Sequence, residues 1–281
     1  MNTKSPPSLR CLWSITALLW LSFLLVGKAQ PADSLWQITF QKDSIVTFAV
    51  DPLQQLLAVD HQGVLTQYSP QGKALFQFHN TTLGEDFTID ATDPFNILLF
   101  YQEQQTIVLL DRTLSERATL DLRDTPVQYA TAVARSHDNN LWVYDEWAGR
   151  LYRLSARGEL LFTSNDFRLS EDLTDGPTQI LRWGDRLALN FPQRGIALFS
   201  ILGQLEAWWE ITEVEDCFFQ QQQLYFRQNG DYYRYFPQQQ VTQILEWPEP
   251  TKQPTFYREQ LDRRYLLFAD GTLVVESRVG F

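Results

Sequence analysis

The side chains that most often carry catalysis are few in this sequence, and their spacing matches no catalytic motif. The three histidines, His61, His79 and His137, fall in expected turns or at a repeat boundary, outside any ligand-spaced cluster such as His-x-x-x-His. Neither a Gly-x-Ser-x-Gly nucleophile motif nor a phosphate-binding glycine loop is present. Cys217 has no histidine near it in sequence, so we expect a small buried apolar residue rather than a nucleophile.

Aromatic residues are the chemical signal that remains. We expect most of them to pack in the core, including Trp142, Trp183, Trp208, Trp209, Trp247 and the run from Tyr232 to Phe236. Trp147 differs because it stands at the apex of an expected turn, beside Asp145 and Glu146. Exposed tryptophan and arginine dominate binding energetics, so Trp147, Asp145, Glu146 and Arg258 are our candidates for a binding face. An aromatic side chain among acids suits a cationic or polar partner.

The elements that position these residues repeat six times along the chain. Short apolar runs recur at gaps of 42, 43, 46, 37 and 42 residues, beginning at Leu56, Leu98, Leu141, Leu187, Leu224 and Leu266. Each run is followed by a turn and a second strand-like run. Self-similarity at this period, with several strands per unit, predicts an all-β fold, a six-bladed β-propeller with four antiparallel strands per blade.

The first repeat shows how the residues divide into strands. We expect strands over 45–50, 56–60, 64–68 and 74–78, with Asp51-Pro52 opening the first turn. The turn between the third and fourth strands recurs as Ser-x-x-Gly, in which glycine accepts a positive φ, at Ser69–Gly72, Ser155–Gly158, Ser200–Gly203 and Ser277–Gly280. No sustained helical period occurs after residue 29, so helix content should be low.

The last blade lacks its outer strand, because only Phe281 follows Gly280. The alternating segment 35–40 near the N-terminus has no place in the first repeat. Pairing it with residues 272–278 would close the ring and cover two exposed sheet edges. We therefore expect the N-terminal strand to complete the last blade.

The first 29 residues are typical of a secretory signal. Lys4 and Arg10 precede an apolar stretch over 12–26, and Gly27-Lys28-Ala29 offers small residues before a mature start at Gln30. The alternative is an uncleaved anchor, for which a 15-residue stretch is short. Residues 30–281 would then form one propeller domain of 252 residues, with Cys217 as its only cysteine and no intramolecular disulfide. These features favour a periplasmic or secreted protein of a Gram-negative bacterium.

Acidic residues dominate the charge. The whole chain carries a net charge of −11, and removal of residues 1–29 takes away three basic residues and gives −14. A surface of this sign repels phosphate backbones, so nucleic acid and anionic membrane surfaces are excluded as expected partners. We expect a monomer without a membrane span once the signal is cleaved.

The segment 132–162 resembles an NHL-type propeller blade. The resemblance rests on residues 138–145, which read Asp-Asn-Asn-Leu-Trp-Val-Tyr-Asp, and on residues 149–155, which read Gly-Arg-Leu-Tyr-Arg-Leu-Ser. Residues 50–72 match nearly as well, and the likeness fades over the last three repeats. The wider group includes NHL, TolB-like and SMP-30/gluconolactonase-like six-bladed propellers. The resemblance implies the fold, and this fold hosts unrelated functions.

The enzymes of that group imply an alternative function. A resemblance to metal-dependent lactonases implies a divalent cation, such as calcium, held by carboxylate and amide oxygens at the mouth of the central channel. Asp86, Asp175, Glu213 and Glu215 stand at comparable places before inner strands, although the ligand motifs of that group are absent around them. We therefore expect an exported, non-enzymatic binding or scaffold propeller without a cofactor. A metal-dependent hydrolase working at the channel mouth is the alternative.

Overall fold

The structure is a computed structural model that describes residues 34–40, 45–171, 173–247 and 253–277. Within these residues, 24 strands form six antiparallel sheets of four strands each. The expected signal segment 1–29, the start at Gln30 and the turn that ends at Gly280 lie outside the described residues. The expected all-β, six-bladed architecture is confirmed.

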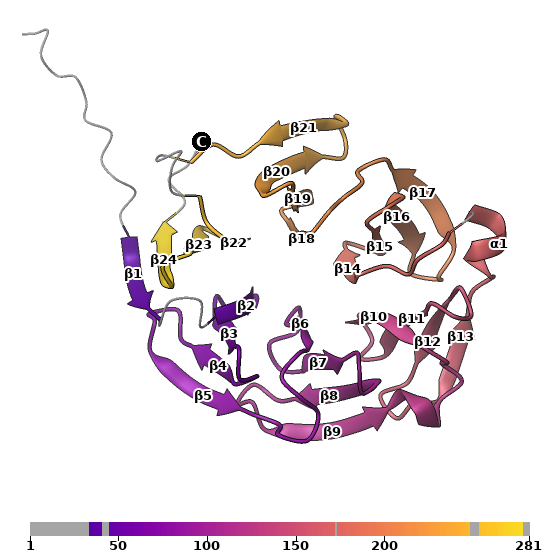
Figure 1. The fold of residues 1–281 in the computed structure, drawn as a ribbon. Coiled ribbons are helices and arrows are strands. Elements are labelled where there is room, and N and C mark those ends of the chain that lie inside the picture. Colours follow the sequence, from indigo (N-terminus) through magenta and orange to yellow (C-terminus); the bar gives the residue numbers. More distant parts are fainter. Residues whose placement is uncertain (1–33, 41–44, 172, 248–252, 278–281) are drawn as a thin grey trace, which may run out of the picture. The chain divides into compact units, whose positions relative to one another are not determined.

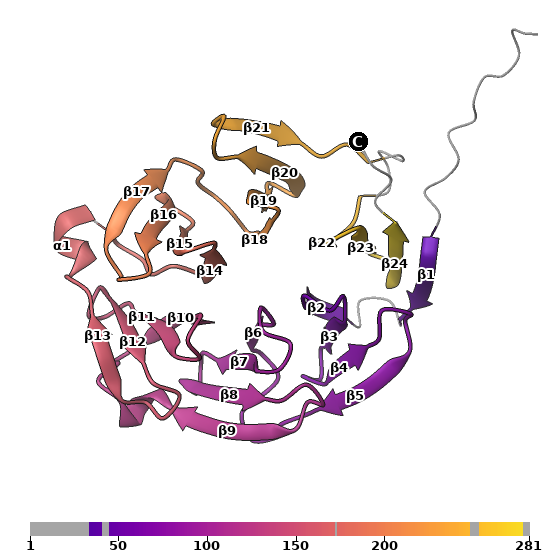
Figure 2. The same cartoon turned by 180° about the vertical axis from the view of Figure 1, so that it is seen from behind.

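The six sheets are blades set in a ring, with one strand of each blade at the centre (Figures 1 and 2). Blades one to three consist of β2 (Ile45–Val50), β3 (Leu56–Asp60), β4 (Leu65–Tyr68) and β5 (Ala74–Phe78); β6 (Thr88–Asp90), β7 (Ile97–Tyr101), β8 (Thr106–Leu110) and β9 (Glu116–Asp121); and β10 (Ala130–Arg135), β11 (Leu141–Asp145), β12 (Arg150–Leu154) and β13 (Leu160–Thr163). The remaining blades consist of β14 (Gln179–Trp183), β15 (Arg186–Phe191), β16 (Gly195–Ser200) and β17 (Leu205–Trp209); β18 (Asp216–Gln220), β19 (Gln223–Gln228), β20 (Asp231–Phe236) and β21 (Val241–Ile244); and β22 (Phe256–Gln260), β23 (Arg263–Leu267), β24 (Thr272–Ser277) and β1 (Ser34–Thr39).

The middle strands of each blade are apolar because they are covered by a neighbouring blade on both faces. In β7 and β8 every residue is buried, whereas the outer strand β5 is largely exposed. Buried side chains of adjacent blades form shared clusters, such as Leu98 and Phe100 of blade two with Leu141 and Val143 of blade three. Burial on two faces explains why the runs are continuous rather than alternating.

The N-terminal strand closes the ring as expected. β1 pairs antiparallel with β24, placing Trp36 opposite Val275 and Ile38 opposite Leu273. The indole nitrogen of Trp36 also donates a hydrogen bond to the carbonyl oxygen of Pro70 at 2.9 Å, which ties β1 to blade one. The edge of β24 is thereby covered.

The turns follow the expected chemistry. In the turn from Ser69 to Gly72, the glycine has a φ of +78° and its N–H bonds to the serine carbonyl at 2.9 Å. The helices in the described residues are a 3₁₀ turn, η1 (Leu122–Asp124), and one short helix, α1 (Phe167–Glu171), in the connection from blade three to blade four. No helix in this part of the chain is long and apolar enough to cross a membrane.

The strand order gives the ring two faces. The connections between blades and the turns between second and third strands lie on one face, which we call the linker face. The turns between first and second strands and between third and fourth strands lie on the other, which we call the hairpin face. Among the described residues, the connections on the linker face contain thirteen acidic and three basic residues. Those on the hairpin face contain seven acidic and three basic residues.

Candidate functional site

The channel between the six inner strands contains a cavity of about 530 Å³. Its lining comes from both ends of the inner strands, from Asp86 and Thr178 at the linker face to Pro52 and Gln260 at the hairpin face. The wall is mixed, because rings such as Phe48 alternate with hydroxyl, amide and charged groups. A volume of this size is within the range of small-molecule sites, so the channel is large enough for a small ligand.

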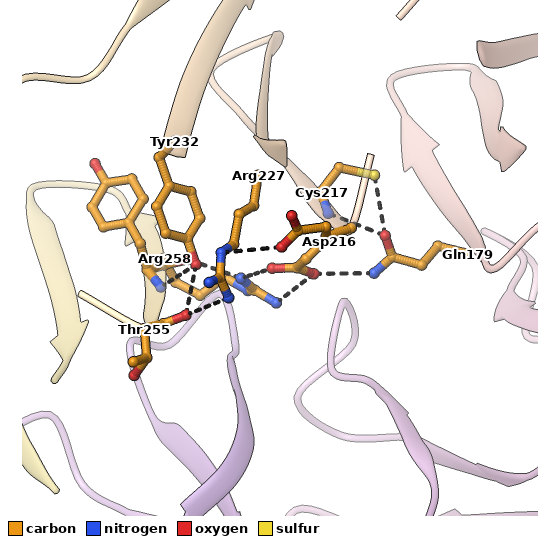
Figure 3. A network of polar contacts seen from close by, with 9 residues as sticks. Gln179, Asp216, Cys217, Arg227, Tyr232, Thr255 and Arg258 are labelled. Atoms are coloured by element: carbon orange, nitrogen blue, oxygen red, sulfur yellow. Dashed lines mark hydrogen bonds and ion pairs between the residues drawn. The ribbon is translucent and has the colours of Figure 1, made fainter. Parts of the chain in front are cut away.

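A polar network crosses the linker-face end of this channel and joins three blades (Figure 3). Arg258 of β22 donates two hydrogen bonds to the carboxylate of Asp216 of β18, at 2.6 and 3.0 Å. Gln179 of β14 donates to the same carboxylate at 3.2 Å, and its carbonyl oxygen accepts bonds from the backbone N–H and the thiol of Cys217, both at 3.1 Å. The inner strands of blades four, five and six are therefore linked by side chains rather than by a β-ladder.

The Arg258–Asp216 pair is largely withdrawn from solvent. The two side chains are 15% and 19% exposed, and the guanidinium carbon lies 5.1 Å from the ring centroid of Phe218 and 5.9 Å from that of Phe48. Burial raises the pKa of the Cys217 thiol well above its usual value, which keeps the sulfur protonated and unreactive. The pair clamps the inner strands of blades five and six together, and removing either partner would leave a buried charge without its counter-ion.

A second layer of the network fastens blade five to blade six (Figure 3). Arg227 and the hydroxyl of Tyr232 both donate to the carbonyl oxygen of Thr255, at 3.1 and 3.3 Å. The Tyr232 hydroxyl also accepts the backbone N–H of Tyr257 at 3.1 Å. These bonds hold the carbonyl oxygen of Thr255, just before β22, and the N–H of Tyr257, within β22, next to Arg258.

Trp147 stands out on the linker face. It occupies the turn between β11 and β12 as expected, and it is 62% exposed. Its ring stacks on Tyr129, with centroids 5.4 Å apart and an interplanar angle of 22°. The backbone N–H of Glu146 bonds to the carbonyl oxygen of Tyr129 at 2.9 Å, which holds the two segments together.

Arg168 of α1 fixes the same turn from its other side. Its guanidinium donates to the carbonyl oxygen of Trp147 and forms an ion pair with Asp166 at 3.0 Å. The hydrogen bond from Arg168 holds the pKa of Asp166 below its usual value. Gly149 has a φ of +62°, and a Cβ there would lie 2.5 Å from side-chain atoms of Arg168 and Asp166, so only glycine fits. The turn that presents Trp147 is therefore rigid.

The four acidic residues that the lactonase resemblance suggested as metal ligands lie in connections before three different blades. Asp86, Asp175, Glu213 and Glu215 are all exposed, in connections before blades two, four and five. Glu215 is engaged by Arg227 at 3.2 Å. Among the described residues, no group of three or more histidine, cysteine, aspartate or glutamate side chains is arranged to hold a metal ion.

The other binding-face candidates divide between two places. Glu146 is half-buried next to Trp147. Asp145 is fully buried, and its carboxylate accepts the backbone N–H groups of Gln128, Tyr129 and Ala148, so it shapes the turn. Arg258 lies inside the channel and not on the face. Cys217 is buried in an inner strand, as expected, and the three histidines are exposed.

Comparisons with solved structures identify the fold. A search against the profiles of known protein families finds no match, and a search of curated protein sequences finds none either. The chain is similar to a catalytically inactive virginiamycin B lyase of Staphylococcus aureus with quinupristin (TM-score 0.61, 9% identity, 87% of this chain and 99% of the lyase). It is also similar to a streptogramin B lyase, with a TM-score of 0.57 and 13% identity over 88% of each chain. A third similar structure is the Pan2 WD40 domain of Neurospora crassa, with a TM-score of 0.62 and 10% identity over 88% of this chain and 95% of that domain. At these identities the likeness shows the propeller fold alone, and the NHL or SMP-30 subgroup stays a prediction.

Proposed function

We propose that this protein is an exported, non-enzymatic binding module that holds a cationic segment of a partner protein on its linker face. The observation that carries the proposal is the solvent-exposed Trp147, stacked on Tyr129 and fixed by Arg168. Single exposed apolar side chains are common on protein surfaces, but this one is stacked on a second aromatic ring and stands in a turn whose carbonyl oxygen is bonded by Arg168. Tryptophan side chains held in this way are enriched at the centres of binding sites. A site for a partner accounts for both its exposure and its rigidity.

The charge of the linker face selects the kind of partner. Thirteen acidic residues against three basic ones in its described connections attract lysine and arginine side chains and raise the rate of encounter. A tryptophan face binds a guanidinium or ammonium group by a cation–π contact, worth about 0.5–2 kcal/mol. The acidic surroundings and the indole thus favour the same chemical group.

The signal-like segment 1–29 supports export to the periplasm or the exterior. Its basic start, its apolar stretch and the small residues before Gln30 are those of a cleaved secretory signal, which would bring the propeller to the periplasm or the exterior. Mass spectrometry of the N-terminus of the purified protein tests this part. A chain that begins at Met1 and stays in the membrane fraction would mean an anchor instead.

Fluorescence anisotropy with a labelled arginine-rich peptide tests the binding face. We expect the purified protein to bind this peptide, with an affinity that falls as salt is raised, and to ignore a glutamate-rich peptide of the same length. Trp147→Ala should weaken binding about tenfold or more, which corresponds to about 1.4 kcal/mol.

Leu202→Ala is the matched control, because Leu202 is equally exposed but lies in a turn of the hairpin face. It should bind the peptide as the unchanged protein does. If Trp147→Ala and Leu202→Ala bind alike, the peptide is held by diffuse charge and Trp147 is not the centre of a site.

A further inference from the structure

Three exposed apolar side chains lie at successive turns on the hairpin face. Leu261, Leu53 and Phe95 each occupy the turn between the first and second strands, in blades six, one and two respectively. Each is at least half exposed, and the three blades are neighbours in the ring, because β2 contacts both β22 and β6. We call these three residues the apolar arc.

Side-chain hydrogen bonds hold the turns of the arc. Gln54 donates to the carboxylate of Asp262 at 2.6 Å, which joins the turns of blades one and six. In blades one and two the same Asp-Pro-apolar sequence recurs, and the N–H groups of Leu53 and Phe95 each bond to the preceding aspartate at 2.9 Å. Two blades therefore present an apolar tip that is held by the same backbone bond to an aspartate side chain.

Leu261 shows that the arc is costly for the isolated fold. Its φ is +56°, a left-handed conformation that disfavours a leucine, and its side chain is 55% exposed. Leu114 has the same φ but is 3% exposed, so core packing repays its strain. Most other non-glycine residues with positive φ in the described part of the chain are glutamine or asparagine. Leu261 gains no such packing within one copy of the chain.

We infer, in place of the monomer expected from the sequence, that the apolar arc is a self-association surface on which a second copy of this chain docks. An apolar patch is complementary to itself, as a contact around a two-fold axis requires. Without residues 1–29 each chain carries a net charge of −14, so two copies repel. In the described connections the acidic excess is ten on the linker face (13 − 3) and four on the hairpin face (7 − 3), so contact through the hairpin faces meets the weaker repulsion. The same contact places the linker faces on the outside of the pair, where they stay free.

The footprint of the arc argues against a lipid surface. The corresponding turns of the other three blades carry polar or small residues at their tips: Asp138 and Asn139, Gly184 and Asp185, and Gln221 and Gln222. A planar bilayer would meet all six of these inner turns, including the three polar ones. A second copy offset around the two-fold axis covers the turns of blades six, one and two alone.

Analytical ultracentrifugation of the processed protein over a wide concentration range tests the inference. We expect a reversible dimer that strengthens with added salt, because salt screens the repulsion between the two acidic chains. Leu261→Asn should weaken the dimer at least tenfold without unfolding the chain, since asparagine tolerates the left-handed conformation. Phe95→Ser should have the same effect through a turn with no strained φ at that residue.

Leu161→Ser is the matched control, because Leu161 is about as exposed but lies on the outer strand β13. It should dimerise as the unchanged protein does. A protein that stays monomeric at every concentration, or arc variants that dimerise normally, would overturn the inference. A monomer that floats with neutral phosphatidylcholine vesicles would overturn it in favour of a lipid contact.

Discussion

The indole of Trp147 lies flat against the phenol ring of Tyr129, with the two ring centroids 5.4 Å apart. The two residues belong to different segments of blade three, the turn after β11 and the connection before β10. The stack forms on the linker face, where the turn between β11 and β12 lies next to the segment that leads into β10. Tyr129 covers one side of the indole, and most of the indole surface remains in water.

Trp147→Ala should leave the fold intact. The side chain is 62% exposed, so its removal opens no core cavity, and substitutions at such positions usually change the free energy of unfolding by about 0.5 kcal/mol or less. Thermal melting of the variant beside the unchanged protein measures this. A drop of many degrees would show that the stack on Tyr129 holds the blade together and that Trp147 is a structural residue.

Gly149→Ala should destabilise the protein and weaken binding of a basic peptide. The new methyl group would meet Arg168 and Asp166 at 2.5 Å, and alanine disfavours a φ of +62°, so we expect a loss of about 1–3 kcal/mol. Urea unfolding gives the loss. In an Arg168→Ala background the same change should cost less, because one clash is then absent while the backbone strain and the contact with Asp166 remain. Arg168→Ala alone measures the cost of losing its bonds to Trp147 and Asp166. If Gly149→Ala costs the same with and without Arg168, the clash with Arg168 contributes nothing to the loss.

The fold was largely predictable from the sequence because propeller blades repeat. In blade one the expected strands 45–50, 56–60 and 74–78 match β2, β3 and β5, and the third begins one residue later than expected, at Leu65. The closing strand was predictable for a different reason. An outer strand was missing at one end of the chain and an unassigned alternating segment stood at the other.

The contacts between blades were not predictable in the same way. Arg258 was grouped with the binding face, whereas the structure places it in the channel with Asp216, 42 residues away in sequence. Side-chain pairs between neighbouring blades have no fixed spacing, because the connections differ in length. Arg168, in the long connection 164–176, was missed for the same reason. A lone arginine among its acids was the available signal.

Deleting residues 30–42 should destabilise the propeller and promote aggregation. The deletion removes β1, so β24 loses its pairing partner and blade one loses the hydrogen bond from Trp36 to Pro70. Thermal melting and light scattering measure the two effects. A shortened protein that stays soluble with an unchanged melting temperature would mean that β1 contributes little to closure.

Breaking the channel ion pair from either side should destabilise the fold. Arg258→Met leaves Asp216 largely buried with only Gln179 to donate to it, so we expect a loss of about 2–4 kcal/mol. Asp216→Asn should cost a similar amount, because it leaves the guanidinium without its counter-ion. The double variant should lose less than the sum of the two, and urea unfolding of all four proteins closes the cycle. Additive losses would show that the pair does not act as a clamp.

Asp51 should make the stability of the propeller depend on pH. It is fully buried, one carboxylate oxygen accepts the N–H groups of Leu53 and Gln55, and the other has no partner. Burial raises the pKa of Asp51 from 3.8 to about 6, against the lowering effect of the two backbone bonds. Because the folded state binds this proton more tightly, the contribution of Asp51 to stability falls as the pH rises from about 4 to about 6. Above about pH 6, the ionised Asp51 lowers the free energy of unfolding by on the order of 3 kcal/mol relative to its protonated form.

Asp51→Asn isolates this contribution from the other titrating groups. The amide oxygen still accepts the two turn N–H groups, but the side chain no longer ionises, so the variant should gain stability relative to the unchanged protein as the pH rises through the same window. The gain should level off above about pH 6. A buried amide N–H₂ without a partner would lower the whole difference curve by a constant amount and leave its slope unchanged. Urea unfolding of both proteins between pH 4 and 8 gives the curve, and a flat difference would show that Asp51 is already charged at the acid end of the window.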